Sequence, residues 1–268
     1  MNDTPLFALR RGAGPLLISI PHLGTTIPPH LRERHTAEAL TVPDTDWHLD
    51  RFYEFANAMD ATIICAKVSR YVIDLNRPAT GESLYPGMIT TSLCPTETFR
   101  DGAIYVEGAE PDASEIAQRV QTYWRPYHEA LQAEITRLRS RHPHVLLWEA
   151  HSIASVLPRL FEGKLPDLNF GTSNGESCHH SVVESALRAV RTCEQTWVLN
   201  GRFKGGFITR HYGAPQTGVH AIQLEMCQSL YMDESFPFGW CEDLACRAIP
   251  TVRASVERAL EGLVGLSG

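Results

Sequence analysis

A short apolar run, Val145–Ile153, constrains the fold of this 268-residue chain more than any other feature. The segment before it, Arg141–His144, is typical of a turn, and the run itself passes into Glu149, His151 and Ser152. Continuous apolar runs of this length are typical of central strands covered by helices on both faces. The sequence therefore predicts an α/β fold whose chemistry lies where this strand ends.

The composition sets further limits on the class of protein. The chain is 43% hydrophobic and 21% charged, contains no visible linker or repeat, and is expected to form one domain over residues 1–268. Its formal net charge of -7 argues against nucleic-acid binding, which needs a basic surface. Any anionic ligand must then be held by a few local arginines.

The chain shows no signal for export or membrane insertion. No charged start leads into an apolar core, and no apolar run approaches the length of a membrane span. Seven scattered cysteines, none in a close Cys-x-x-Cys pair, favour reduced thiols over disulfides or a thiolate zinc site. We therefore expect a soluble, cytoplasmic protein with a small-molecule ligand. The oligomeric state is not predicted.

Two histidines follow predicted buried strands. Pro15–Ile20 is an apolar run that ends at His22, as Val145–Ile153 does at His151. Each histidine could be a metal ligand or base, or simply a hydrogen-bonded core residue. A helix is expected from Asp44 to about Met59 and a strand over Tyr71–Leu75. Further helices are expected over residues 112–141 (kinked near Pro126), 177–191 and 244–263 (with a possible break at Pro250). Further strands are expected over residues 167–172 and 196–199.

The last predicted strand, Gly218–Met226, carries a carboxylate among apolar residues. Period-two geometry puts Ala221, Gln223 and Glu225 on one face and His220, Ile222 and Leu224 on the other. A buried carboxylate is costly unless it is paired or functional, so Glu225 is the best candidate for a general base. The glycine-rich segment 200–213 before it is either a ligand-binding loop or a flexible hairpin.

Two histidines and an acid from separate strand ends are the ligands of a catalytic zinc site. His22, Asp46 and His151 with Glu225 fit that arrangement. Asp44 and Asp46 could equally cap a helix, and Asp50 could be solvated surface. The chain has no His-Glu-x-x-His helix, so these residues are not a self-contained zinc signature. The absence of a Gly-x-Ser-x-Gly elbow disfavours a serine hydrolase, and the absence of a Gly-x-Gly-x-x-Gly turn and of a phosphate-binding loop disfavours nucleotide chemistry.

The sequence resembles the N-formylglutamate amidohydrolases in six blocks that span most of the chain. They are Ile20–Gly24, Asp46–Asp50, Ile73–Pro78, Glu149–Ser152, Gly205–Gly213 and His220–Met226. That family looks like the zinc carboxypeptidases and aspartoacylases. The implied fold is a three-layer α/β/α sandwich, phosphorylase/hydrolase-like, with a mixed, mostly parallel sheet of about eight strands.

The resemblance implies zinc-dependent hydrolysis of N-formyl-L-glutamate to L-glutamate and formate, in histidine degradation, although another divalent metal is possible. It places His22 and His151 as metal ligands and Glu225 as the base for the metal-bound water that attacks the formyl carbon. The carboxypeptidase-like acid position falls on Thr25, so Asp46 is preferred as third ligand, with Asp44 and Asp50 as second options. Arg70 would stabilise the developing charge; the predicted substrate ligands are Asn76, Arg77, Arg210 and Tyr212.

Two other functions fit the same residues. A relative with this site could hydrolyse other N-acyl amino acids or act as a carboxypeptidase. From a different class, the chain could be a metal-binding scaffold or sensor without turnover. An unliganded acid such as Glu225 beside the metal speaks against the scaffold, because a structural zinc site has no use for a base.

Overall fold

The computed structural model describes residues 5–84, 87 and 90–266. Seven strands form one mixed sheet in the order β1-β3-β2-β4-β7-β5-β6. The strands are β1 (Phe7–Arg10), β2 (Leu16–Ile20), β3 (Thr62–Ala66), β4 (Val145–Ile153), β5 (Leu168–Gly171), β6 (Trp197–Leu199) and β7 (Val219–Cys227). The described residues thus give seven strands where the resemblance implied about eight, and the α/β class is confirmed.

Four neighbouring strands, β3, β2, β4 and β7, run parallel. β1 is antiparallel to β3 at one edge, β5 is antiparallel to β7, and β6 is parallel to β5 at the other edge. Because the four parallel strands end at the same side of the sheet, the polar residues that follow them are brought together there.

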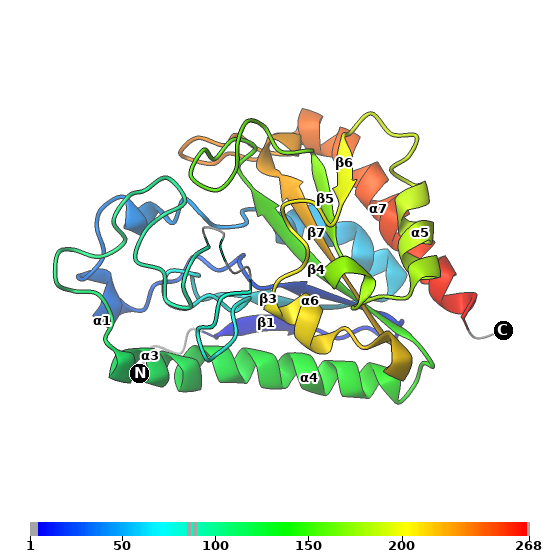
Figure 1. The fold of residues 1–268 in the computed structure, drawn as a ribbon, viewed down its shortest axis with the longest axis horizontal. Helices are drawn as coiled ribbons and strands as arrows, with labels where there is room; N and C mark the ends of the chain where they lie inside the picture. The colour runs from blue at the N-terminus through cyan, green and yellow to red at the C-terminus, as the bar shows by residue number, and fades with distance from the viewer. Residues whose placement is uncertain (1–4, 85–86, 88–89, 267–268) are drawn as a thin grey trace.

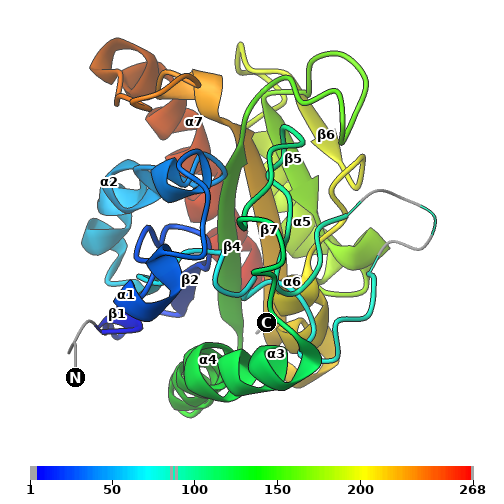
Figure 2. The ribbon, with the colours of Figure 1, turned by 90° about the vertical axis from the view of Figure 1, so that its left-hand side faces the viewer.

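Helices cover both faces of the sheet, so the central strands are apolar on both sides. The helices are α1 (Pro29–Arg32), α2 (Leu49–Phe52), α3 (Ala113–Arg119), α4 (Arg125–Arg139), α5 (His180–Arg188), α6 (Phe207–Tyr212) and α7 (Glu242–Val264). α4 lies along the bottom of both views of the ribbon and α7 in the upper part, with strands between them (Figures 1 and 2). This arrangement confirms the three layers.

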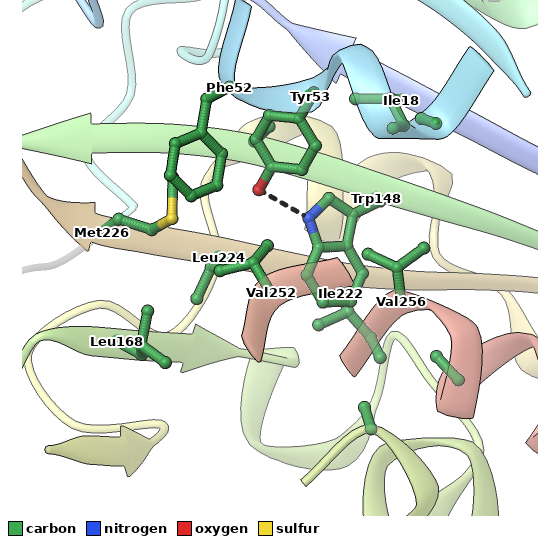
Figure 3. Close-up of a cluster of buried hydrophobic side chains, with 14 of the residues drawn as sticks. Ile18, Phe52, Tyr53, Trp148, Leu168, Ile222, Leu224, Met226, Val252 and Val256 are labelled. Atoms are coloured by element: carbon green, nitrogen blue, oxygen red, sulfur yellow. Dashed lines mark hydrogen bonds between the residues drawn. The ribbon is translucent and has the colours of Figure 1, made fainter. Parts of the chain in front are cut away.

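Alternate residues of each central strand pack into different clusters. Trp148 of β4 and Ile222 and Leu224 of β7 pack with α2, α5 and α7, whereas Leu147 and Ala221 pack with α4 and α6. Figure 3 shows the first cluster, in which the Trp148 Nε1–H donates to the Tyr53 hydroxyl over 3.0 Å. The predicted division of faces in the last strand is therefore confirmed.

Two predicted elements differ from the structure at the site. Tyr71–Leu75 is buried but forms turns, with the Asp74 amide bonded to the carbonyl of Leu93. A buried apolar run need not be a strand where loop backbone satisfies its polar groups. The helix expected from Asp44 begins only at Leu49, after His48 at the N-cap, so neither Asp44 nor Asp46 caps it and Asp46 does not share a helical face with Asp50.

Elsewhere the boundaries of long helices follow the sequence pattern. The segment from Ala113 to Arg139 is helical but interrupted by a π-helical turn at Val120–Trp124, just before Pro126. α7 runs unbroken through Pro250, contrary to the possible break, because Pro250 is exposed and water can satisfy the carbonyl that loses its partner. The shorter one-turn 3₁₀ helices are Ala39–Thr41, Ser173–Gly175, Pro215–Thr217 and Gln228–Leu230, and a longer one, Tyr53–Met59, follows α2.

Candidate metal centre

The structure brings His22, Asp46 and His151 together at the carboxyl edge of the parallel strands. One ligand atom from each lies within 4.8 Å of the others, and all three side chains are buried. Among the residues that the structure describes, no other group of three or more histidine, cysteine, aspartate or glutamate side chains is placed to hold a metal ion. The three ligands expected from sequence therefore share one location.

Local backbone contacts fix this convergence. His22 follows β2 directly, and its carbonyl accepts a hydrogen bond from the Asp46 amide over 3.0 Å, which ties the segment before α2 to the end of the strand. His151 lies within β4, where it is the register partner of Glu225 in β7. The loop acid, the strand-end histidine and the β4–β7 pair are thus held by the sheet itself.

Both imidazoles present their Nδ1 atoms to the same oxygen of Asp46. The Oδ2 atom lies 3.0 Å from His151 Nδ1 and 3.8 Å from His22 Nδ1, and the His22 Nδ1 has no hydrogen-bond partner among the described residues. An unpartnered buried nitrogen aimed at a carboxylate and a second imidazole is costly on its own. Two imidazoles and one carboxylate are a donor set that suits zinc, so these residues fit the ion.

Each imidazole is held from behind by another carboxylate. Asp74 Oδ1 lies 2.7 Å from His22 Nε2, and Glu149 Oε1 lies 2.6 Å from His151 Nε2. With a cation on the two Nδ1 atoms, these contacts would hold the ring protons at Nε2, as outer-shell carboxylates do in metal sites. Sequence reasoning gave neither acid a role, although each lies two residues from a predicted site residue.

The acids change the charge preference of the centre. Burial alone would lower the pKa of His151, but the carboxylates of Glu149 and Asp46 raise it well above its ordinary value. Burial would raise the pKa of Asp74, yet His22 and Arg70 hold it well below the usual range. A site that favours an extra proton through its carboxylates also favours a divalent cation.

Glu225 is buried beside this cluster, and together with His22 and His151 it lines a cavity. Burial raises its pKa to about 8, and the nearby carboxylates of Asp46 and Glu149 add to the effect while His151 and Arg70 oppose it. A cation at the histidines would lower that pKa, because an opposite charge favours the ionised carboxylate. The cavity measures about 70 Å³. Glu225 is the only carboxylate among the described residues that line it.

The two alternative acids do not face the cluster. The Asp44 Oδ2 accepts hydrogen bonds from the Tyr71 hydroxyl and the Phe99 amide, at 2.7 and 2.8 Å, and burial raises the pKa of this carboxyl. Asp50 is exposed and its Oδ1 accepts from the amide of Arg51. The geometry therefore favours Asp46 over both.

The other predicted site residues fall into two groups. Arg70, Asn76 and Arg77 line the cavity, and Asn76 Nδ2 lies 3.0 Å from His151 Nε2. Arg210 and Tyr212 are not among the lining residues: the Arg210 Nε–H donates to the Gly205 carbonyl, and the Tyr212 hydroxyl lies 2.9 Å from His128 Nδ1. Substrate binding by these last two stays a prediction without a geometric counterpart.

The glycine-rich segment 200–213 forms helix α6 and the loop that precedes it, so the prediction of a flexible hairpin is wrong. The amides of this segment bond to buried site side chains: Gly206 to Gln223 over 2.7 Å, Ile208 to the Asn76 Oδ1 over 2.9 Å and Thr209 to Glu149 over 3.0 Å. Arg202 and Phe203, just before it, line the cavity. Sequence reasoning chose Arg210 of this segment as a substrate ligand and did not single out Arg202.

A model of the N-formylglutamate amidohydrolase family matches residues 14–232. The chain belongs to the N-formylglutamate amidohydrolase family. It is 46% identical over 244 residues to an N-formylglutamate deformylase of Pseudomonas putida, covering 90% of each chain. A deformylase of the same description from Pseudomonas aeruginosa is 44% identical over 261 residues, covering 97% of this chain and 96% of the relative.

Two solved structures share the fold of this chain. The N-formylglutamate amidohydrolase of Ralstonia eutropha superposes with a TM-score of 0.82 at 23% identity, covering 97% of this chain and 99% of the other. A gene product of Agrobacterium tumefaciens, Atu2144, gives a TM-score of 0.71 at 17% identity, covering 99% and 97%. At identities of 23% and 17%, these two comparisons show that the fold is shared and no more.

Proposed function

We propose that this amidohydrolase hydrolyses N-formyl-L-glutamate to L-glutamate and formate with the help of a zinc ion. The names of its relatives at 44% and 46% identity support the reaction. The observation that carries the metal is the convergence of two Nδ1 atoms on one oxygen of Asp46, at 3.0 and 3.8 Å. Another divalent cation could replace zinc in the same donor set.

His22, Asp46 and His151 would hold the ion. When bound, it would lower the pKa of a water toward neutrality and polarise the formyl carbonyl. Asp74 and Glu149 hold the two imidazoles in the tautomer that this requires. The ligands come from a sheet edge and an anchored loop, so little reorganisation is needed at the moment of reaction.

Glu225 acts as the general base. Its place in the cavity wall, as the register partner of His151, lets it take a proton from the attacking water and later deliver it to the amine that leaves. The group that metal ligation uses does not include Glu225, so its carboxylate stays available for the proton.

Arg70 stabilises the negative charge that develops on the formyl oxygen. Its guanidinium is buried in the cavity wall, 3.0 Å from Asp74 Oδ2, 3.7 Å from Asp46 Oδ1 and 4.7 Å from the centre of the Phe99 ring. These contacts hold the donor in place before the substrate arrives, which is what charge stabilisation of this kind needs.

Arg77 and Asn76 bind the α-carboxylate of the substrate. The Arg77 Nε–H donates to the Thr91 carbonyl over 3.0 Å, which fixes the plane of the guanidinium. The neighbouring amide of Asn76 lies against His151, so this pair is next to the reacting centre. A planar guanidinium matches a carboxylate with two parallel hydrogen bonds.

We also propose a role in histidine degradation and a cytoplasmic location. The role in histidine degradation follows from the family resemblance. All seven cysteines are free thiols, which supports a reducing compartment such as the cytoplasm. In the described part of the chain, no helix is long and apolar enough to cross a membrane.

The test combines metal analysis with product formation. We expect the purified protein to carry about one divalent ion per chain and to release formate from N-formyl-L-glutamate. Chelation should abolish the release, and added zinc should restore it. Full activity of metal-stripped protein would contradict the metal assignment. Equal or faster turnover of N-acetyl amino acids or of peptides would instead favour the broader amidohydrolase or carboxypeptidase reading.

A further inference from the structure

The cavity wall is more positive than the chain as a whole. Arg70, Arg77 and Arg202 line it against one carboxylate, Glu225, although the chain carries a formal net charge of -7. A cluster of one sign of charge in a cleft with low-dielectric walls concentrates ligands of the opposite sign. The wall therefore suits a ligand with more than one negative group.

Two of these arginines already have positions beside the reacting centre. Arg70 faces the carboxylates of Asp74 and Asp46, at 3.0 and 3.7 Å, which offset much of its charge. Arg77 adjoins Asn76, whose amide touches His151. The α-carboxylate of an N-formyl amino acid is separated from the formyl nitrogen by a single carbon, so it falls to Arg77.

Arg202 comes from a different part of the chain. It lies between β6 and α6, and its Nε–H donates to the carbonyl of Leu160, in the segment between β4 and β5, over 3.0 Å. Its guanidinium carbon lies 5.3 Å from the centre of the Phe203 ring. The hydrogen bond and the ring together hold the guanidinium in the cavity wall, which it shares with the apolar side chains of Ile153, Leu160 and Phe203.

We propose that Arg202 binds the side-chain carboxylate of an N-formyl dicarboxylic amino acid, and that Ile153, Leu160 and Phe203 pack against its methylene groups. Arg202 is then the residue that makes the enzyme prefer a glutamate substrate to its neutral isostere. The inference rests on the proposed function, and it replaces Arg210 with Arg202 as the second carboxylate ligand.

The test compares N-formyl-L-glutamate with N-formyl-L-glutamine, which has the same shape without the second charge. In Arg202→Gln we expect kcat/KM for N-formyl-L-glutamate to fall on the order of 100-fold, mostly through KM. The value for N-formyl-L-glutamine should change by less than about threefold, because the lost interaction is absent there. Arg202→Lys should give an intermediate loss, since it keeps the charge but not the planar fork.

Arg253→Gln is the matched control, because it removes an arginine from the exposed surface of α7. It should leave kcat/KM unchanged for both substrates. If wild-type protein releases no formate from N-formyl-L-glutamate, the proposed function fails. If it does, but Arg202→Gln keeps the wild-type preference, the assignment of Arg202 is wrong. The same holds if Arg210→Gln removes the preference instead. Should Arg202→Gln not fold, the substrate preference of Arg202→Lys decides.

Discussion

Each imidazole of the metal centre is enclosed by two carboxylates that have different tasks. Asp46 faces the Nδ1 atoms, which are the proposed metal ligands, and Asp74 and Glu149 face the Nε2 atoms from behind. In the proposed centre the acid in front would supply a ligand, whereas the acids behind would set the tautomer and the ring plane. Residues of both kinds should therefore affect metal binding, but not to the same degree.

Replacing Asp74 by asparagine should weaken metal binding. The variant keeps the size of the side chain but loses the charge that holds the His22 Nε2–H and Arg70, so we expect about 10- to 100-fold lower metal affinity. Competition with a chelator of known affinity measures the change. Asp44→Asn is the matched control, because Asp44 is also buried but bonds to Tyr71 and Phe99. An equal or larger effect from Asp44→Asn would contradict a specific role of Asp74 behind His22.

Replacing Glu225 by glutamine should separate chemistry from structure. The amide cannot accept the proton of the attacking water, so we expect kcat to fall by about 10²- to 10⁴-fold. Metal content and thermal unfolding should stay close to wild type, because Glu225 is not one of the grouped ligands. Glu257→Gln, on the exposed side of α7, serves as control. Wild-type turnover in Glu225→Gln, or loss of its metal, would refute the role of base.

Among the elements, the short helix α6 holds two side chains of the site in place, and we call this arrangement the α6 clamp. Its first amides bond to Asn76 and Glu149, so the same short helix holds a proposed substrate ligand and the acid behind His151. Gly206 lies at the N-cap, where a Cβ atom would overlap the side chain of Asn76. Glycine is needed here for close approach, since its φ of −83° is open to any residue.

Gly206→Ala should displace Asn76 and with it the amide beside His151. We expect activity to fall by about 10- to 100-fold, because small misplacements at a reacting centre are costly. The free energy of unfolding should fall by about 1–3 kcal/mol, as in other overpacked sites. Kinetics and urea unfolding measure both. Gly239→Ala, whose added Cβ meets nothing within 4 Å, should match wild type. An unaltered rate in Gly206→Ala would show that the clamp does not matter.

One buried histidine of the core makes the stability of the whole fold depend on pH. His128 of α4 is buried between Leu75 and Tyr212, its Nε2–H donating to the Leu75 carbonyl over 2.9 Å. Burial lowers its pKa to about 4. The unfolded histidine takes up a proton near pH 6.5 while the folded one resists until about pH 4, so this contribution to stability is complete above pH 6.5 and is lost as the pH falls.

The shift predicts a specific pH dependence. Between pH 7.5 and 5, protonation of unfolded His128 should cost the wild type about 2 kcal/mol in free energy of unfolding. His128→Gln removes the titrating group, so its deficit relative to wild type should shrink by about that amount. Urea unfolding of both proteins at the two pH values measures the difference. Parallel pH profiles would show that His128 does not titrate in this way.

From the sequence alone, the central strands β2, β4 and β7 and the grouping of His22, Asp46 and His151 could be predicted, because burial imposes short-range patterns. The run Val145–Ile153 is a strand with the predicted bounds, and period two placed Glu225 on the correct face. His22 and His151 could be linked because parallel strands end at one edge of the sheet. The single-domain organisation of residues 1–268 stays a prediction.

The residues that complete the site are identified by contacts between parts of the chain that are distant in sequence. Asp74 and Glu149 act through contacts with imidazoles, and the contact of Asp74 joins residues that are 52 positions apart. Arg202 faces the cavity because its loop is bonded to Leu160, 42 residues earlier, whereas Arg210 turns back to the loop backbone. A local pattern reports whether a residue is buried, but not which distant group it meets. That choice follows from the sum of packing contacts across the fold.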